Sequence, residues 1–256
     1  MPRLPLADWR TEQCRLTVFP MPDAGTRTSE WWEAVTDGKP DEATMSPKKG
    51  SGLIHGVLGP GKLILKLEPD RIDWLLTPQD PDLEALAEQP EFPTFGPAVE
   101  MLELFSGVAE KWLALEDIPA VGRMAFGAIL VHPEMDRRAG YLRLPDYLPV
   151  QADPESSDFL YQINLPPVAS ATGLDGLRLN RLSRWSVARF KLIALRFTGA
   201  TVAERAFPEP FALRIELDIN TAPEFTGPIP SARLVEVYRE LVGAARTIAT
   251  NGVVPQ

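Results

Sequence analysis

The sequence predicts an α+β fold in which a largely antiparallel sheet, or sheets, carries helices packed on one face. Segments of alternating apolar and polar residues follow one another without regular alternation of strand and helix, and each series is closed by a segment with helical spacing. Strands in series followed by a helix are typical of antiparallel sheets. The 26 prolines fall mostly between these segments and so mark loops. The order predicts two similar halves of four strands and a helix, residues 1–117 and 118–256, forming one compact unit.

In the first half, we expect strands at residues 14–19, 53–58, 62–67 and 72–76. The segment 62–67 alternates clearly, because Leu63, Leu65 and Leu67 point to one side of a strand. Ser29 is a favoured N-cap residue and begins a short helix, SEWWEAV. The polar segment 37–52 is expected to be a mobile loop, and apolar residues at helical spacing predict a closing helix over 97–115.

In the second half, we expect strands at residues 121–131, 159–165, 185–197 and 211–219, with a short connecting element at 139–149. Pro230 suits the first position of a helix and begins the closing helix 230–249. The apolar stripe of this helix consists of Leu234, Tyr238, Leu241, Ala245 and Ile248. Two helices on one face predict a binding groove between them, or between the two half-sheets.

The composition is that of a globular protein, with 45% apolar and 24% charged residues. A net charge of −9 disfavours nucleic acid and anionic membranes as general partners. No run approaches the roughly 18 apolar residues of a membrane span, and the N-terminus has no apolar signal region, so we expect a cytoplasmic protein. The single cysteine, Cys14, is expected to be a half-buried structural thiol.

The stretch GVLGPGKL places Gly56, Gly61 and Lys62 at the spacing of a phosphate-binding loop. Leu63 stands where that loop needs a hydroxyl for Mg²⁺, and Pro60 removes one of the amides that would hold phosphate. The residues that follow alternate as a strand and not as a helix. The stretch therefore predicts a hairpin turn.

The segment VHPEMD brings His132, Glu134 and Asp136 close together after a predicted strand. These are weak metal candidates, because a metal site needs a third or fourth ligand from elsewhere and the only other histidine is His55. A structural or solvated histidine is the favoured interpretation, so we expect neither a metal nor another cofactor.

A basic segment at residues 178–196 contains no acidic residue. We single out five of its residues as candidates for binding a ligand or partner: Arg184, Trp185, Arg189, Lys191 and Arg196. Cations beside an aromatic ring suit an anionic ligand or nucleic acid. The favoured alternative is a solvated sheet face that Glu216 and Asp218 neutralise from a neighbouring strand.

Trp31 and Trp32 are adjacent in the predicted short helix. Adjacent helical residues point in different directions, so at least one indole is expected to be partly exposed. Core packing is the favoured interpretation, and an anchor for a partner protein is the alternative.

The second half resembles a sporadically distributed, functionally uncharacterised family of bacterial proteins of about this length. Its segments VGRMAFGAILV, PDYLPV, FLYQINLPP, LRIELDIN and LVEVYRELVGAARTIA fall in the order of the family's motifs, from about residue 92 to the end. Arg123 matches the first arginine of the family's central R-I-G-L-R-Y-I-N strand, and Glu216 and Asp218 match two acidic positions of its final L-D-x-D strand. Gly127 and Leu130 depart from it, since the family has arginine and asparagine there. The resemblance implies architecture and no activity.

We expect a non-enzymatic binding or adaptor protein that acts with a protein partner in an accessory or defence-type gene cluster. The sequence has no G-x-S-x-G, H-E-x-x-H or paired C-x-x-C motif. One alternative is a metal-dependent hydrolase or nuclease-like enzyme that uses the histidine–acid cluster or Glu216 and Asp218. The other is recognition of an anionic ligand or nucleic acid, a less favoured partner, by the basic segment.

Overall fold

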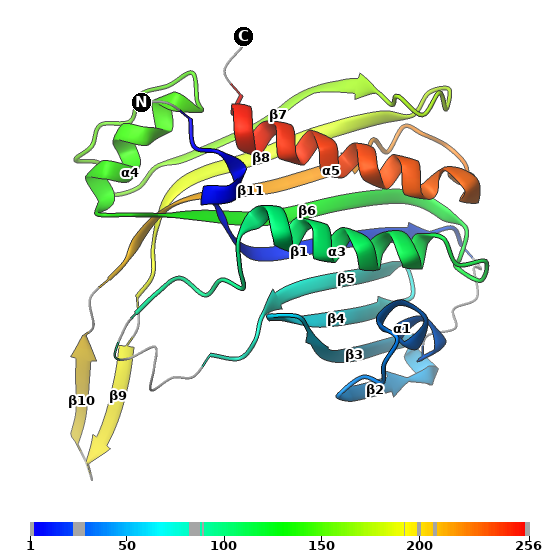
Figure 1. Cartoon of the computed structure of the whole chain (residues 1–256), viewed down its shortest axis with the longest axis horizontal. Helices are drawn as coiled ribbons and strands as arrows, with labels where there is room; N and C mark the ends of the chain where they lie inside the picture. The colour runs from blue at the N-terminus through cyan, green and yellow to red at the C-terminus, as the bar shows by residue number, and fades with distance from the viewer. Residues whose placement is uncertain are drawn as a thin grey trace.

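The fold is built on one antiparallel sheet of nine strands in the order β2-β3-β4-β5-β1-β6-β11-β8-β7 (Figure 1). The computed structural model describes residues 3–22, 29–81, 88, 90–191, 193–198, 201–206 and 209–253. Strands from residues 1–117 and strands from residues 118–256 meet where β1 pairs with β6, so both parts of the chain share one sheet. The α+β class and the antiparallel pairing are confirmed.

The strands of this sheet are β1 (Arg10–Pro20), β2 (Glu42–Ser46), β3 (Ser51–Leu58), β4 (Gly61–Glu68), β5 (Arg71–Pro78), β6 (Val121–Glu134), β7 (Leu160–Ala169), β8 (Arg178–Arg189) and β11 (Phe211–Thr221). A separate hairpin consists of β9 (Ile193–Thr198) and β10 (Thr201–Ala206). The α-helices are α1 (Ser29–Thr36), α3 (Ala98–Leu113), α4 (Arg137–Arg143) and α5 (Leu234–Asn251). Short 3₁₀ turns lie at Leu6–Asp8, Pro47–Lys49, Leu144–Asp146 and Ser231–Arg233.

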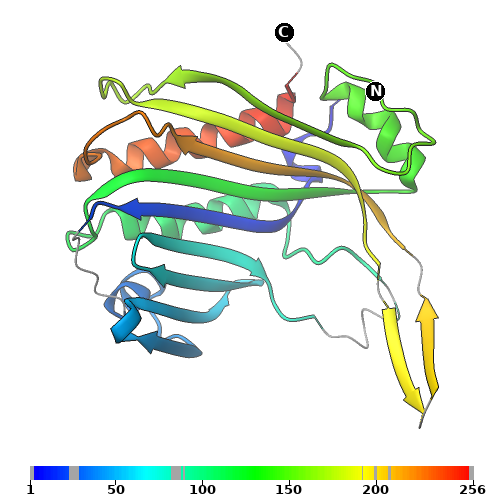
Figure 2. The same cartoon turned by 180° about the vertical axis from the view of Figure 1, so that it is seen from behind.

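Helices α3 and α5 lie side by side on one face of the sheet, with α3 against β1 and α5 against β6 and β11 (Figure 1). Helix α1 packs against α3 on the same side. Seen from behind, the strands stand in front of these helices, and no helix in the described part of the chain covers them (Figure 2). We call this uncovered side the open face. The predicted packing of the helices on one face is confirmed.

The alternation in the sequence decides which side chains face the helices. Leu63, Leu65 and Leu67 of β4 are buried, as are Leu213 and Ile215 of β11. The residues that alternate with them, Ile64 and Lys66 in β4 and Arg214 in β11, point to the open face. Helix α5 buries its predicted stripe, Leu234, Tyr238, Leu241, Ala245 and Ile248. Burial of these stripes, at roughly 25 cal/mol per Å² of apolar surface, is the main force that holds helices to sheet.

Trp31 and Trp32 are both buried, at 0% and 2% exposure, so the prediction that one indole is partly exposed is wrong. The ring of Trp31 meets that of Trp112 edge-on at 5.6 Å, and the ring of Trp32 stacks on that of Trp74 at 6.0 Å. The two side chains diverge, but α1 lies beside α3 on the same face of the sheet, so Trp31 packs against α3 and Trp32 packs against β5. Neither is an exposed anchor for a partner.

Cys14 is fully buried in the centre of the sheet, where its register partners are Leu76 of β5 and Ala128 of β6. It is thus more deeply buried than predicted. Burial raises the pKa of its thiol, because the thiolate would be poorly solvated there. This environment makes the thiol a structural group and not a nucleophile.

The stretch GVLGPGKL forms the β3–β4 hairpin, in which Leu58 pairs with Gly61. Gly59 takes a φ of 56°, a left-handed conformation that glycine adopts without strain. The chain after Lys62 continues as β4, so no helix N-terminus is available to complete a phosphate site. The predicted hairpin is confirmed.

The largest differences from prediction concern three segments. The segment 37–52, expected to be a loop, contains β2, an edge strand of mostly exposed residues whose sequence carries little apolar pattern. The strand expected at 185–197 is wrong: β8 begins at Arg178 and ends at Arg189, and the following residues enter β9 of the separate hairpin. The closing helix of the second half begins at Leu234 after a 3₁₀ turn, and not at Pro230. Within the described residues, no helix has the length and hydropathy that a membrane span requires.

Candidate functional site

Two rows of residues cross the centre of the open face. Each row contains one residue from each of five adjacent strands. The first row runs Gln13, Ile129, Glu216, Arg184 and Gln162 from β1 to β7. The second row runs Arg15, Gly127, Asp218, Leu182 and Asn164. Cross-strand neighbours of this kind lie about 4.5–5.5 Å apart, so these side chains form one continuous surface.

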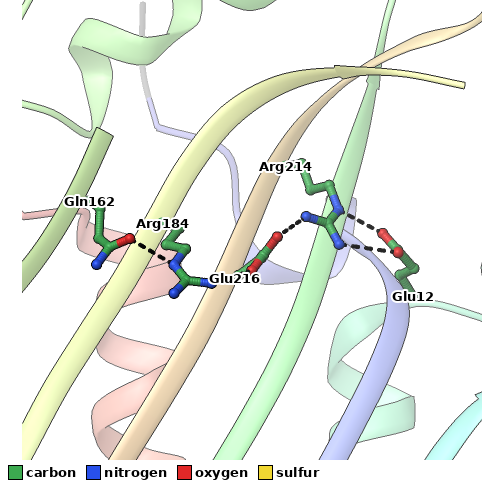
Figure 3. A network of polar contacts seen from close by, with 5 residues as sticks. All are labelled: Glu12, Gln162, Arg184, Arg214 and Glu216. Atoms are coloured by element: carbon green, nitrogen blue, oxygen red, sulfur yellow. Dashed lines mark hydrogen bonds and ion pairs between the residues drawn. The ribbon is translucent and has the colours of Figure 1, made fainter. Parts of the chain in front are cut away.

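A network of hydrogen bonds and ion pairs joins side chains across this surface (Figure 3). Arg184 donates from Nε to Gln162 Oε1 at 2.8 Å and places Nη1 3.4 Å from Glu216 Oε2. Arg214 binds the other oxygen of Glu216 and reaches across β6 to Glu12, with 2.9 Å between Arg214 Nε and Glu12 Oε2. Glu12 reaches this position because it lies in the register shift of β1 between Thr11 and Gln13.

Arg214 is the centre of this network, with a side chain only 19% exposed. Its burial opposes the charged form, but hydrogen bonds and Coulomb attraction to Glu12 and Glu216 raise the pKa of its guanidinium above the ordinary value. The network therefore fixes charged side chains in place on the open face.

A pocket of about 170 Å³ opens in this surface between the two rows. Its lining residues are Gln13, Arg15, Gly127, Ala128, Ile129, Leu182, Arg184, Glu216, Leu217 and Asp218. The structure thus brings together three residues that the sequence singled out, Arg184, Glu216 and Asp218. We call this the Gly127 pocket.

The floor of the Gly127 pocket exists because Gly127 has no side chain. A Cβ there would lie 3.5 Å from both Nε and Nη2 of Arg15, so the guanidinium lies directly beside the glycine. Arg15 Nε is buried and has no hydrogen-bond partner among the described residues. The sequence did not single out Arg15, and the signal that could have found the pocket is a glycine inside a strand, which often marks a close approach.

The basic segment does not form one surface. Arg184 lies on the open face and pairs with Glu216, so the predicted cross-strand neutralisation is confirmed for this pair. Trp185 faces the other side and is fully buried against Trp9 and Tyr147, so its predicted part in an exposed ligand surface is wrong. The reason is alternation, since neighbouring residues of a strand point to opposite faces.

The remaining residues of the basic segment lie away from the pocket. Arg189, at the end of β8, pairs with Glu209 at 3.0 Å. Lys191 is exposed and follows the end of β8. Arg196 lies in β9, and its side chain is outside the described part of the structure.

Arg123 lies near the start of β6, where its guanidinium is 5.4 Å from the centre of the Phe19 ring. Asp218 pairs in register with Gly127, four residues further along β6. Arg123 and Asp218, two of the positions on which the family resemblance rests, therefore lie in different surroundings on the open face. Arg123 supplies a cation–π contact on the open face.

The histidine–acid cluster is used inside the fold. His132 Nδ1 lies 3.1 Å from Glu134 Oε1, and Arg143 donates to the same oxygen at 2.5 Å. Asp136 caps α4 by accepting a hydrogen bond from the Ala139 amide at 2.7 Å. Within the described residues, no three acidic, histidine or cysteine side chains are grouped to hold a metal ion.

Replacing Glu134 by glutamine is expected to lower the free energy of unfolding by about 1–3 kcal/mol at neutral pH, because two charge-assisted hydrogen bonds weaken. Burial alone would raise the pKa of Glu134, but bonds from His132 and Arg143 hold the pKa below the ordinary 4.5. The stabilisation is therefore present above pH 4.5 and lost as pH falls through the lowered pKa.

Urea unfolding of wild type and the Glu134→Gln variant at pH 7 and below pH 4 measures this difference. The matched control is Glu155→Gln, whose carboxylate is 73% exposed in its pair with Arg138 and should leave stability unchanged. A difference between wild type and Glu134→Gln that is the same at both pH values would contradict the prediction.

The predicted groove between the closing helices is also present, with a volume of about 460 Å³ between α3 and α5. Its walls include Gly107 and Gly243, and the Arg239–Glu110 ion pair bridges it. Both glycines have open space where a Cβ would stand. The groove is therefore an exposed depression in the helix layer, separate from the Gly127 pocket.

A scan against protein-family models gave no match to this chain, and a search of curated proteins gave none either. The resemblance of the second half to the bacterial family therefore stays a prediction.

Proposed function

We propose that this protein is a non-enzymatic binding or adaptor protein that acts in the cytoplasm and recognises a protein partner with its open face. The observation that carries the proposal is the one-sided sheet. The helices cover one face, while the other presents a fixed network of charged side chains and a pocket. A partner that covers this face would meet side chains already held in place, which reduces the entropy lost on binding.

The charge balance of the open face favours a protein over nucleic acid. Its cations are mostly paired with acids: Lys66 with Glu68, Arg71 with Asp73, and Arg184 and Arg214 with Glu216. Nucleic-acid binding depends on unpaired Lys and Arg facing phosphates. A surface of alternating charges and apolar residues such as Ile129 instead matches the mixed character of protein interfaces.

Further parts of the proposal rest on the sequence alone. They are the membership of an accessory or defence-type gene cluster and the description of residues 1–117 and 118–256 as two similar halves. The shared sheet supports the description of two halves in one respect: strands β1–β5 form one side of the sheet, and β6, β7, β8 and β11 form the other side.

The proposal is tested by capturing the tagged protein from its native cytoplasm and identifying stoichiometric complexes by native mass spectrometry. The variant Ile129→Arg places a charged side chain at the centre of the open face, and its aliphatic stem keeps the contacts of isoleucine. We expect it to weaken capture of the partner at least tenfold. The matched control is Thr247→Arg, an exposed position on α5 on the opposite side of the sheet.

Circular dichroism establishes that both variants are folded. Equal loss of the partner from both variants, or from neither, would place the interface elsewhere and contradict the proposal. Turnover of a substrate that depends on one polar residue of the open face would show an enzyme instead.

A further inference from the structure

The Gly127 pocket contains two opposite charges, those of Arg15 and Asp218, for which the described residues supply no ion-pair partner. Four charged side chains line it, and Glu216 is bound by Arg184 and Arg214. Asp218 accepts a hydrogen bond from Asn220 Nδ2 at 3.0 Å, and no described cation forms an ion pair with it. Arg15 likewise has no acidic partner among the described residues, and its buried Nε donates to none of them.

Arg15 and Asp218 lie on either side of Gly127 and line the same pocket. Arg15, Gly127 and Asp218 are register partners in three adjacent strands and share the open face. Arg15 Nε and Nη2 each lie 3.5 Å from the place of the absent Cβ. A buried donor without a partner costs about 1–3 kcal/mol, and an acceptor from outside the chain that enters the pocket would remove this cost.

We propose that the Gly127 pocket binds a small α-amino acid as a zwitterion, with its carboxylate on Arg15 and its ammonium group toward Asp218. The four charges of the lining sum to zero, so a neutral ligand that separates its own charges matches the pocket better than a simple ion. A plain anion would face the carboxylate of Asp218, and a plain cation would face the guanidinium of Arg15.

The size of the pocket sets the size of the ligand. Its 170 Å³ is roughly five to six times the ~30 Å³ that one water occupies in the liquid. Glycine and alanine, with five and six non-hydrogen atoms, have the matching size, and Leu182 and Ile129 form apolar walls beside them. This inference goes beyond the proposed function, because it requires no protein partner.

The test is a titration of the ¹⁵N-labelled full chain with glycine, followed by amide chemical shifts. We expect saturable shifts at Arg15, Gly127 and Asp218. Acetate and methylammonium, which each carry one half of the zwitterion, should bind at least tenfold more weakly than glycine. The variants Arg15→Met and Asp218→Asn should each weaken glycine binding at least tenfold, while Arg239→Met on α5 should leave it unchanged.

Two outcomes would overturn the proposal. Acetate binding as strongly as glycine would show a simple anion site, and no saturable shift with glycine in folded wild-type protein would show that Arg15 and Asp218 serve only the fold. Capture of a partner plays no part in the titration, so either proposal can fail while the other stands.

Discussion

Replacing Trp112 by alanine is expected to lower the free energy of unfolding by about 3–5 kcal/mol, as for other large aromatic residues in cores. Trp112 is fully buried in α3, and its ring contacts those of Trp31 and Trp74 at 5.6 and 6.1 Å. The indole thus connects α3 with α1 and with β5 of the sheet. Alanine would leave a cavity at the junction of three elements, and a rigid sheet on one side limits how far it can collapse.

Urea unfolding followed by circular dichroism measures this loss. The matched control is Leu160→Ala on β7, where the side chain is 66% exposed and a change close to zero is expected. Glycine in place of Trp112 would add a backbone effect, so alanine is the cleaner substitution. A loss below about 1 kcal/mol for Trp112→Ala would mean that the aromatic cluster is not packed as described.

Replacing Arg214 by methionine is expected to cost about 2–3 kcal/mol, because Glu12 and Glu216 would lose their shared cation. Full burial of a broken pair costs roughly 3–5 kcal/mol, and water reaches this network in part, since Glu12 is 25% and Glu216 36% exposed. The substitution keeps an unbranched side chain over β6, so the loss reports charge more than packing.

Thermal and urea unfolding measure the effect, and the triple variant Arg214→Met, Glu12→Gln, Glu216→Gln should recover part of the lost stability. The matched control is Arg239→Ala, which breaks the pair of an exposed arginine, 63% accessible, with Glu110 and should not change the melting temperature measurably. An equal loss of stability in the Arg214 and Arg239 variants would show that the network stabilises the fold no more than an exposed ion pair does.

The fold was largely predictable because its strands obey a single rule. A sheet covered on one face only leaves the other face polar, and this produces the clean alternation of β4 and β11. Two kinds of element escaped prediction. Strand β2 lies at the sheet edge and is mostly exposed, so its residues need no apolar pattern. Strand β8 ends at Arg189 because its partner strand β11 begins opposite it at Phe211, and this pairing is not encoded in the local sequence.

The candidate site was predictable only in part. Arg184, Glu216 and Asp218 stood out as charges in adjacent strands, and the structure places all three at one pocket. Arg15 and Gly127 did not stand out, because the register of β1 against β6 brings them together from positions more than a hundred residues apart. Trp185 was misassigned to the site, since the register of β8 places it beside Ile215 of β11 and turns its indole toward the helices.

The fully enclosed thiol of Cys14 gives the protein a built-in kinetic probe of its own opening. As the only cysteine in the chain, it can react with a thiol reagent only when β1 separates from its neighbours. When closing is faster than labelling, the observed rate reports the equilibrium between closed and opened forms. Thiol labelling of the wild-type protein therefore shows whether a molecule bound to the open face slows the opening of the sheet at Cys14. A bound molecule that spans β1 and β6 would protect the thiol, and one that touches only α3 and α5 would protect it less.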